Sequence, residues 1–279
     1  MASKVWFITG TSKGFGRVWA EAALARGDRV AATARDVKTL QPLVERYGDL
    51  VAAITLDVTD KAAVGAAIAE AHARFGRLDV VVNNAGYGLF GAIEEVSEAE
   101  ARAQIETNVF GALWVTQAAL PIMRAQGSGH ILQVSSIGGV NAFPTIGLYH
   151  ASKWALEGFS QSLAGEVAGF GIKVTIIEPG GFATDWGGPS AIRATPDAAY
   201  GAVHEAVAAV RRANTPGDPD ATGPAVLKVV DAADPPLRVF FGSGGLPMTR
   251  AEYERRLALW EQWNDVSVEA QGDLAAKAR

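Results

Sequence analysis

The 279-residue chain contains no cysteine, which excludes disulfide bonds, thiolate catalysis and cysteine metal sites. This absence suits a reducing compartment. Histidine is also scarce, and the four histidines have no spacing typical of metal ligands: His72, His130, His150 and His204. We therefore expect no metal site.

Long apolar runs are missing as well. The longest candidate, residues 109–123, is interrupted by Thr116, Gln117 and Pro121, so no membrane-spanning helix is expected. The apolar run at residues 5–8 stops at a glycine-rich turn, too early for a signal peptide. A net charge of −5 gives no general attraction to nucleic acid or anionic membrane. These absences predict a cytoplasmic protein without nucleic-acid or membrane partners.

Short apolar runs that alternate with helical patterns are the main feature that is present. The strands are predicted at residues 4–9, 29–34, 50–56, 78–82, 129–134, 172–177 and 237–241. The helices are predicted at residues 17–26, 37–47, 61–75, 98–126, 150–170, 196–214, 222–230 and 249–263. This alternation predicts an α/β fold of the Rossmann type, a doubly wound, mostly parallel, seven-stranded sheet with helices on both faces. We expect one domain over residues 1–279, ending in a polar tail that lacks order.

A glycine-rich turn, Gly10-Thr11-Ser12-Lys13-Gly14-Phe15-Gly16, joins the first strand to the first helix. Glycines permit a tight turn and close backbone approach, and a helix N-terminus offers free N–H groups to a pyrophosphate. The spacing differs from the usual G-x-G-x-x-G, and an ordinary strand-to-helix turn is the alternative. The position at the start of the first β–α unit favours a dinucleotide site.

Arg35 follows the second strand, where an arginine accommodates a ribose 2′-phosphate and an acidic residue accepts from the 2′-hydroxyl. Lys13 offers a second positive charge. Asp36 is the competing ribose ligand, although it also suits the N-cap of the next helix. The balance favours NADP(H), with NAD(H) as the alternative.

The other strand ends carry small and polar residues. Asp57 follows the third strand and suits either an adenine contact or the backbone amides of its own turn. Asn83-Asn84-Ala85-Gly86 follows the fourth strand and suits either cofactor packing or a bridge between loops. Ligands of such sheets bind at the carboxyl ends of the strands, where all these residues gather.

Tyr149 and Lys153 lie four residues apart in a predicted helix and therefore share one face. An ammonium beside a phenol favours the tyrosinate and is expected to lower the tyrosine pKa, which forms an acid–base pair. Asn108 lies among apolar neighbours in the long helix 98–126. There it either ties the helix to a strand or holds a water near the site.

Together these motifs resemble the short-chain dehydrogenase/reductase family, in its compact single-domain branch. The residues that carry the resemblance, over about residues 4–184, are Thr9-Gly10-x-x-x-Gly14-x-Gly16, Asp57, Asn83-Asn84-Ala85-Gly86, Asn108, Ser136, Tyr149-x-x-x-Lys153 and Pro179-Gly180. The family spacing selects Ser136 over Ser135. The stretch after Pro179-Gly180 departs from the family's x-Val-x-Thr, because Gly181 and Phe182 occupy the x-Val positions.

The resemblance implies a hydride transfer between a nicotinamide and a ketone or aldehyde/alcohol pair. Tyr149 would be the general acid or base, Ser136 would stabilise charge on the carbonyl oxygen, Lys153 would lower the tyrosine pKa and hold the ribose, and Asn108 would position a relay water. The implied cofactor-binding residues are Gly10, Ser12, Lys13, Gly14, Phe15, Gly16, Arg35, Asp57, Val58, Asn84, Ala85, Gly86, Tyr149, Lys153, Pro179, Gly180, Phe182 and Thr184.

The resemblance further implies a substrate lid at about residues 185–220, a C-terminal extension at about residues 243–279, and a homodimer or homotetramer paired through helices 98–126 and 150–170. Trp186, Phe182 and Phe143 are candidates for an apolar substrate pocket, with a hydroxysteroid-dehydrogenase-like or general carbonyl reductase activity. One alternative is a non-catalytic NADP-sensing regulator on the same fold. Another is a sugar-nucleotide epimerase or dehydratase, although the larger substrate domain of those proteins is absent.

Overall fold

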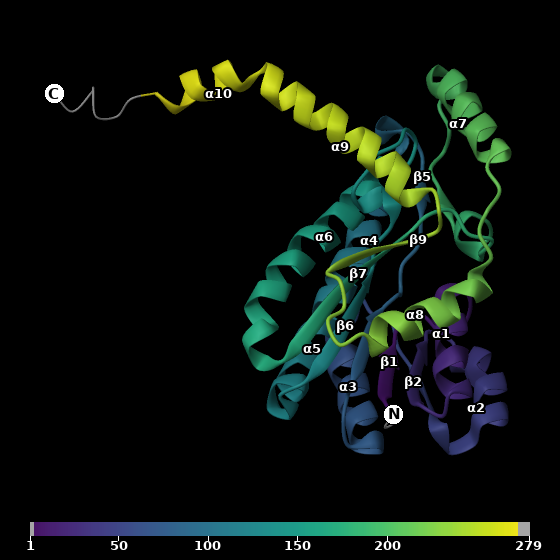
Figure 1. Ribbon diagram of the computed structural model, residues 1–279. Coiled ribbons are helices and arrows are strands. Elements are labelled where there is room, and N and C mark those ends of the chain that lie inside the picture. Colours follow the sequence, from purple (N-terminus) through teal and green to yellow (C-terminus); the bar gives the residue numbers. More distant parts are fainter. Residues whose placement is uncertain (1–2, 273–279) are drawn as a thin grey trace.

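A parallel sheet of seven strands forms the centre of the computed structural model, which describes residues 3–272 (Figure 1). The strand order is β3-β2-β1-β4-β6-β7-β9, and each neighbouring pair is parallel. The strands are β1 (Val5–Ile8), β2 (Arg29–Ala34), β3 (Val51–Thr55), β4 (Val80–Asn83), β6 (Gly129–Val134), β7 (Ile172–Pro179) and β9 (Arg238–Phe241). The predicted doubly wound α/β fold is confirmed.

Ten α-helices lie within the described residues. They are α1 (Gly14–Ala25), α2 (Gln41–Tyr47), α3 (Lys61–Phe75), α4 (Glu98–Ile105), α5 (Gly111–Gln126), α6 (Gly147–Val167), α7 (Gly201–Ala213), α8 (Thr222–Asp231), α9 (Gly245–Gln262) and α10 (Asn264–Gln271).

The side-chain alternation of β1 shows how the helices divide between the two faces. Val5 and Phe7 pack into a core with residues of α3, α5 and α6. Trp6 and Ile8 pack into a second core with residues of α1, α2 and α8. Alternate residues of a strand point to opposite faces, and a sheet that is covered on both faces needs apolar residues at every position.

Four features depart from the predicted elements. A π-helical turn, Glu106–Phe110, joins α4 to α5 inside the predicted helix 98–126, and α5 runs through Pro121. A second small parallel sheet pairs β5 (Leu89–Phe90) with β8 (Ile192–Arg193). The helix predicted at 196–214 starts only at Gly201. The tail expected to lack order after residue 263 continues as α10, and its last residues, 273–279, lie outside the described part of the chain.

Candidate active site

The glycine turn between β1 and α1 has the backbone shape that a phosphate site needs. Gly10 and Gly14 have φ of +70° and +59°, a region that disfavours side chains. A Cβ at Gly16 would collide with the Gly10 carbonyl oxygen and lie 2.5 Å from Asn84 Nδ2. At the helix N-terminus, Lys13 makes no side-chain cap and the first turn has no acidic residue. The first N–H groups of α1 are therefore available to an anion.

Thr9 and Asn84 tie this turn to the end of β4. Asn84 Nδ2 donates to the carbonyls of Thr9 (2.8 Å) and Gly10 (3.0 Å). The Thr9 hydroxyl accepts from the backbone N–H groups of Asn84 and Ala85, each at 2.9 Å. Asn84 therefore bridges the two loops, the structural alternative raised by the sequence, and Thr9 is a positioning residue that the list of predicted site residues lacks.

Three charged residues occupy the region predicted to select the cofactor. Arg35 is exposed at the end of β2 and forms no ion pair with any residue in the described range 3–272. Asp36 caps the following turn by accepting from Lys38 N–H at 3.0 Å, as predicted for an N-cap. Lys13 Nζ lies 3.1 Å from a carboxylate oxygen of Asp185, and both side chains are about half exposed. Arg35 is thus more available to a 2′-phosphate than Lys13.

Asp57 and Val58 lie in the loop after β3. The Asp57 carboxylate accepts from the N–H and hydroxyl of Thr59, at 3.0 and 2.8 Å, so it orders its own turn. Val58 is buried and packs closely against Gly111, because a Cβ added at Gly111 would lie 2.6 Å from Val58 Cγ2. Both residues therefore shape the wall of the sheet edge beside the glycine turn.

Ser136, Tyr149 and Lys153 meet at the carboxyl end of β6. Tyr149 is 5% exposed and lies beside Ser136, whose Oγ accepts from Gly138 N–H at 3.0 Å. Lys153 Nζ lies 5.7 Å from the Tyr149 ring centroid and donates to the Val134 carbonyl at 2.8 Å. The structure therefore brings the hydroxyl, the phenol and the ammonium to one end of the sheet.

Burial controls the pKa values of the pair. It raises the pKa of Tyr149 to about 12, and the Ser136 hydroxyl opposes this shift. The expectation that Lys153 lowers the tyrosine pKa below its ordinary value is therefore wrong for this geometry. Burial also lowers the pKa of Lys153 to about 8, although the charge of Glu157 opposes that shift. At neutral pH Tyr149 holds its proton and Lys153 is largely charged.

Asn108 is fully engaged with the protein. Its Nδ2 donates to the Tyr87 carbonyl (3.1 Å) and to Ser152 Oγ (3.0 Å), and its Oδ1 accepts from Tyr87 N–H (3.2 Å). Ser152 Oγ donates in turn to the Tyr149 carbonyl at 2.6 Å. Asn108 therefore joins the loop after β4 to α6, rather than tying its helix to a strand. Its place in the π-turn is typical of functional sites.

His150 is a second positioning residue that the sequence analysis did not assign. Its Nδ1 lies 3.0 Å from the Gly138 carbonyl, and its Nε2 accepts from Phe143 N–H at 3.0 Å. Burial lowers the pKa of His150, which favours the neutral ring that these two bonds require. The ring braces the loop that carries Ser136. Adjacency to Tyr149 was the only signal in the sequence.

The segment after β7 reaches back over the site. Gly180 N–H donates to the Phe241 carbonyl at 2.9 Å, which fixes the Pro179-Gly180 corner. Thr184 Oγ1 accepts from Trp186 N–H at 3.4 Å, and the Trp186 ring lies 4.8 Å from the Tyr149 ring, between centroids. Trp186 therefore covers the phenol, as expected for a pocket residue.

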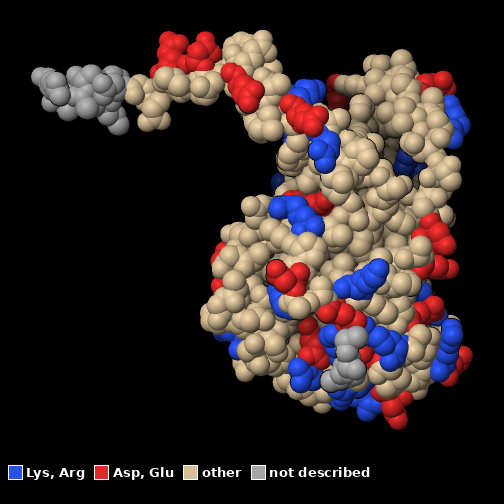
Figure 2. All heavy atoms as spheres, viewed as in Figure 1, with Lys and Arg blue, Asp and Glu red and all other residues tan. Residues whose placement is uncertain are grey.

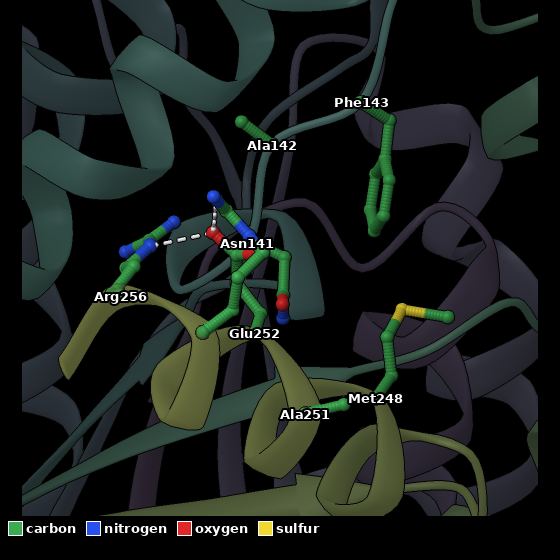
Figure 3. A pocket seen from close by; sticks show the side chains of 8 residues that line it. Asn141, Ala142, Phe143, Met248, Ala251, Glu252 and Arg256 are labelled. Carbon is green, nitrogen blue, oxygen red and sulfur yellow. Dashed lines mark hydrogen bonds and ion pairs between the residues drawn. The ribbon is translucent and has the colours of Figure 1, made fainter. Parts of the chain in front are cut away.

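The other two pocket candidates lie elsewhere. The Phe182 ring packs edge-on against Phe15 at 5.1 Å, on the α1 side of the sheet. Phe143 packs against His150 and lines a cavity of about 530 Å³ together with Met248 and Glu252 of α9 (Figure 3). Ser136, Tyr149 and Lys153 do not line this cavity, so it is distinct from the candidate active site.

Comparison with known proteins identifies the class. The family model for short chain dehydrogenases matches residues 4–192. Oxidoreductase BOA17 of Botryotinia fuckeliana is 43% identical over 270 residues, which cover 95% of this chain and 98% of the relative. This chain belongs to the short-chain dehydrogenase/reductase family, a family of oxidoreductases.

Two solved structures support the assignment. A short-chain dehydrogenase from Streptomyces avermitilis is 42% identical with a TM-score of 0.91, over 96% of this chain and 98% of its own. A short-chain dehydrogenase from Burkholderia cenocepacia, in complex with NADP, is 25% identical with a TM-score of 0.74, over 93% of this chain and 97% of its own. Members of the family thus bind a nicotinamide cofactor.

Within residues 3–272, no group of three or more histidine or acidic side chains is arranged to hold a metal ion. No helix in the same part of the chain is long and apolar enough to cross a membrane.

Proposed function

We propose that the protein is an NADP(H)-dependent reductase of ketones or aldehydes, with Tyr149 as the general acid. One observation carries the proposal: a buried tyrosine that lies beside Ser136 and Lys153, at the sheet edge that also presents the open N-terminus of α1. The pyrophosphate would bind at the glycine turn, and Lys153 would hold the nicotinamide ribose. The nicotinamide, when bound, supplies or accepts the hydride.

The protonation states of Tyr149 and Lys153 favour reduction at neutral pH. A tyrosine with a pKa of about 12 carries the proton that a developing alkoxide takes up. The Ser136 hydroxyl, held by Gly138 N–H, supplies a second donor toward the same oxygen. The ammonium of Lys153 stabilises the tyrosinate that remains after the proton has left.

The first prediction tests the general acid. Tyr149→Phe removes the proton donor and keeps the ring, so turnover of a panel of ketones and aldehydes should fall by at least about 10³-fold, within the range of general acid catalysis. NADPH oxidation measures the turnover, and the fluorescence of bound NADPH measures cofactor affinity, which should stay within a few-fold. A fully active variant would refute the mechanism. NADPH binding by the wild type without turnover across the panel would support the sensor alternative.

The second prediction concerns cofactor choice. Arg35 is an exposed cation at the end of β2, and it forms no ion pair with any of residues 3–272. We therefore propose that it binds the 2′-phosphate. Arg35→Ala should weaken the binding of NADPH by about tenfold or more and leave the binding of NADH nearly unchanged, because only NADPH loses a charge-assisted hydrogen bond. Calorimetric titration of both cofactors measures the effect, and Arg46→Ala on the exposed end of α2 is the control. Equal losses of affinity for NADPH and NADH would refute a role of Arg35 in binding the 2′-phosphate.

We also propose a homodimer or homotetramer that pairs through α5 and α6. Phe110, just before α5, Trp154 in α6 and Phe170, just after α6, remain 38–46% exposed, as apolar side chains of an interface would in a single copy. Light scattering of the purified protein tests the association. The cytoplasmic location and the role of residues 185–220 as a lid stay predictions.

A further inference from the structure

Two arginines flank one buried aromatic ring next to the candidate active site. Phe90 in β5 is 6% exposed, and its ring centroid lies 4.7 Å from the guanidinium carbon of Arg193 and 4.5 Å from that of Arg211. Arg193 comes from β8, which pairs with β5, and Arg211 comes from the last turns of α7. Three segments far apart in the sequence thus converge on one ring.

This pair carries uncompensated charge. Neither guanidinium forms an ion pair with a carboxylate of residues 3–272, and the one hydrogen bond that Arg193 donates there goes to the Gly187 carbonyl at 2.8 Å. Burial and repulsion from Arg193 both lower the pKa of Arg211. Both side chains remain exposed, so an anion from solution can reach them and would relieve the repulsion between the two like charges.

The nearby carboxylates have other partners. Glu94 accepts from the Tyr200 hydroxyl at 2.5 Å, and Glu95 lies 2.8 Å from His204 Nε2, so both engage the start of α7. Seven residues separate His204 from Arg211, which is about 10 Å along a helix. Asp185 pairs with Lys13 instead. In Figure 2, basic atoms are visible set back in the hollow beside the lobe that α7 forms.

Aromatic rings connect the arginines with the reacting centre. The Trp186 ring lies 4.8 Å from the Tyr149 ring and 5.3 Å from the Phe90 ring, between centroids. A Cβ at Gly88 would lie 2.7 Å from the Trp186 ring, so the glycine lets the indole sit in this position. The rings of Trp186 and Phe90 therefore form a continuous apolar surface between the phenol of Tyr149 and the two guanidinium groups.

We propose that Arg193 and Arg211 form an anion subsite for the distal end of the substrate. The substrate class is a carbonyl compound whose apolar chain carries a carboxylate or another anionic group on the order of 10 Å from the carbonyl, the span of about eight extended bonds. Planar guanidinium groups bind such oxyanions with paired hydrogen bonds. This inference rests on the proposed reductase function and adds the substrate class to it.

The test compares an acid with its neutral ester. We measure kcat/KM with NADPH for 9-oxodecanoate and for methyl 9-oxodecanoate, which place an anionic or a neutral group at the same distance from one carbonyl. The wild type should prefer the acid by about tenfold or more, mostly through KM, as a charge-assisted hydrogen bond predicts. Arg193→Gln and Arg211→Gln should each reduce the acid-to-ester ratio toward one, and Arg211→Lys should retain part of the preference.

Arg212→Gln is the matched control, since this exposed neighbour on α7 makes no contact with Phe90. Each ratio is taken on one preparation, so a change in folded fraction cancels. A wild-type ratio near or below one, or a ratio that survives both Arg193→Gln and Arg211→Gln, overturns the subsite.

A binding measurement separates the subsite from the proposed reaction. Decanoate has no carbonyl group, and calorimetric titration into the protein with NADP bound reports the subsite alone. Binding by the wild type that Arg211→Gln weakens about tenfold or more supports the subsite even if 9-oxodecanoate is not reduced, in which case the reductase proposal fails. If the ester is reduced but decanoate binding is undetectable, the reductase proposal is supported and the anion subsite is refuted.

Discussion

At the scale of single residues, Glu157 opposes the effect of burial on the pKa of Lys153, a residue of the proposed active site. Glu157 lies one turn after Lys153 in α6 and raises its pKa, which burial otherwise lowers to about 8. Its carboxylate is held by Arg238 at 2.9 Å. The buried carboxylate therefore favours the charged form of Lys153.

The pH–rate profile tests this third prediction. In the wild type kcat/KM for reduction should fall as pH rises through about 8, since Lys153 then loses its proton. Glu157→Gln removes the charge that raises the pKa, so the fall should begin at lower pH. Glu166→Gln, exposed on the same helix, is the control and should leave the profile in place. Superimposable profiles for the wild type and Glu157→Gln would contradict the role.

The functional residues show how far sequence reasoning reaches. Ser136, Tyr149 and Lys153 could be placed because strand ends and an i, i+4 spacing are local patterns, and the parallel sheet gathers strand ends at one edge. Ser152 and His150 could not be assigned, since their roles depend on partners that only the fold brings close, Asn108 for Ser152 and the segment of Gly138 and Phe143 for His150. The raised pKa of Tyr149 was missed because its main cause is burial, which the sequence does not display.

At the scale of elements, the β1–α1 turn depends on a glycine that touches a neighbouring loop. The fourth prediction is that Gly16→Ala weakens NADPH binding by more than tenfold, because the added methyl group collides with the Gly10 carbonyl and Asn84. Calorimetry measures the affinity.

Gly65→Ala is the matched control for that experiment. Gly65 lies exposed inside α3, and a Cβ there meets no atom within 4 Å. The Gly65→Ala variant should retain cofactor binding and be more stable than the wild type by about 0.5–1 kcal/mol, since alanine favours a helix. Normal NADPH affinity in Gly16→Ala would show that the turn tolerates a side chain.

Element boundaries followed the sequence where packing agreed with the local pattern. The ends of the seven strands lie within two residues of their predicted positions, because near-continuous apolar runs are typical of a sheet covered on both faces. The π-turn at 106–110 and the β5–β8 pairing were not predictable. One depends on hydrogen bonds of Asn108 to two other segments, and the other joins residues about a hundred positions apart.

At the scale of the whole molecule, two buried groups make stability depend on pH in opposite directions. Burial lowers the pKa of His130, in β6, to about 4. The unfolded chain then binds more protons between about pH 4 and 6.5, so stability falls as pH falls through this window. Burial and the nearby charge of Glu157 raise the pKa of Glu178, in β7, to about 8, so its contribution is complete below about pH 4.5 and is lost as pH rises through 8.

Urea unfolding between pH 4 and 8.5 tests this fifth prediction. His130→Gln should flatten the acid side of the stability curve by about 3 kcal/mol, the value of a shift of about 2.5 pKa units. Glu178→Gln should flatten the alkaline side. His72→Gln on α3 is the control and should leave the wild-type curve. A wild-type acid limb retained in His130→Gln would exclude this histidine as its source.

The position of β9 at the edge of the sheet has a consequence for folding during translation. β3, β2, β1 and β4 come from the first 83 residues and can pair early, whereas β9 must wait for residues 238–241 to dock beside β7. At about 5–20 residues per second, translation separates these events by roughly 8 to 30 seconds. β7 is complete only at residue 179, so its edge stays unpaired for the last part of this interval, roughly 3 to 12 seconds at the same rate. A nascent chain stalled between residues 179 and 238 should therefore be prone to edge-to-edge aggregation.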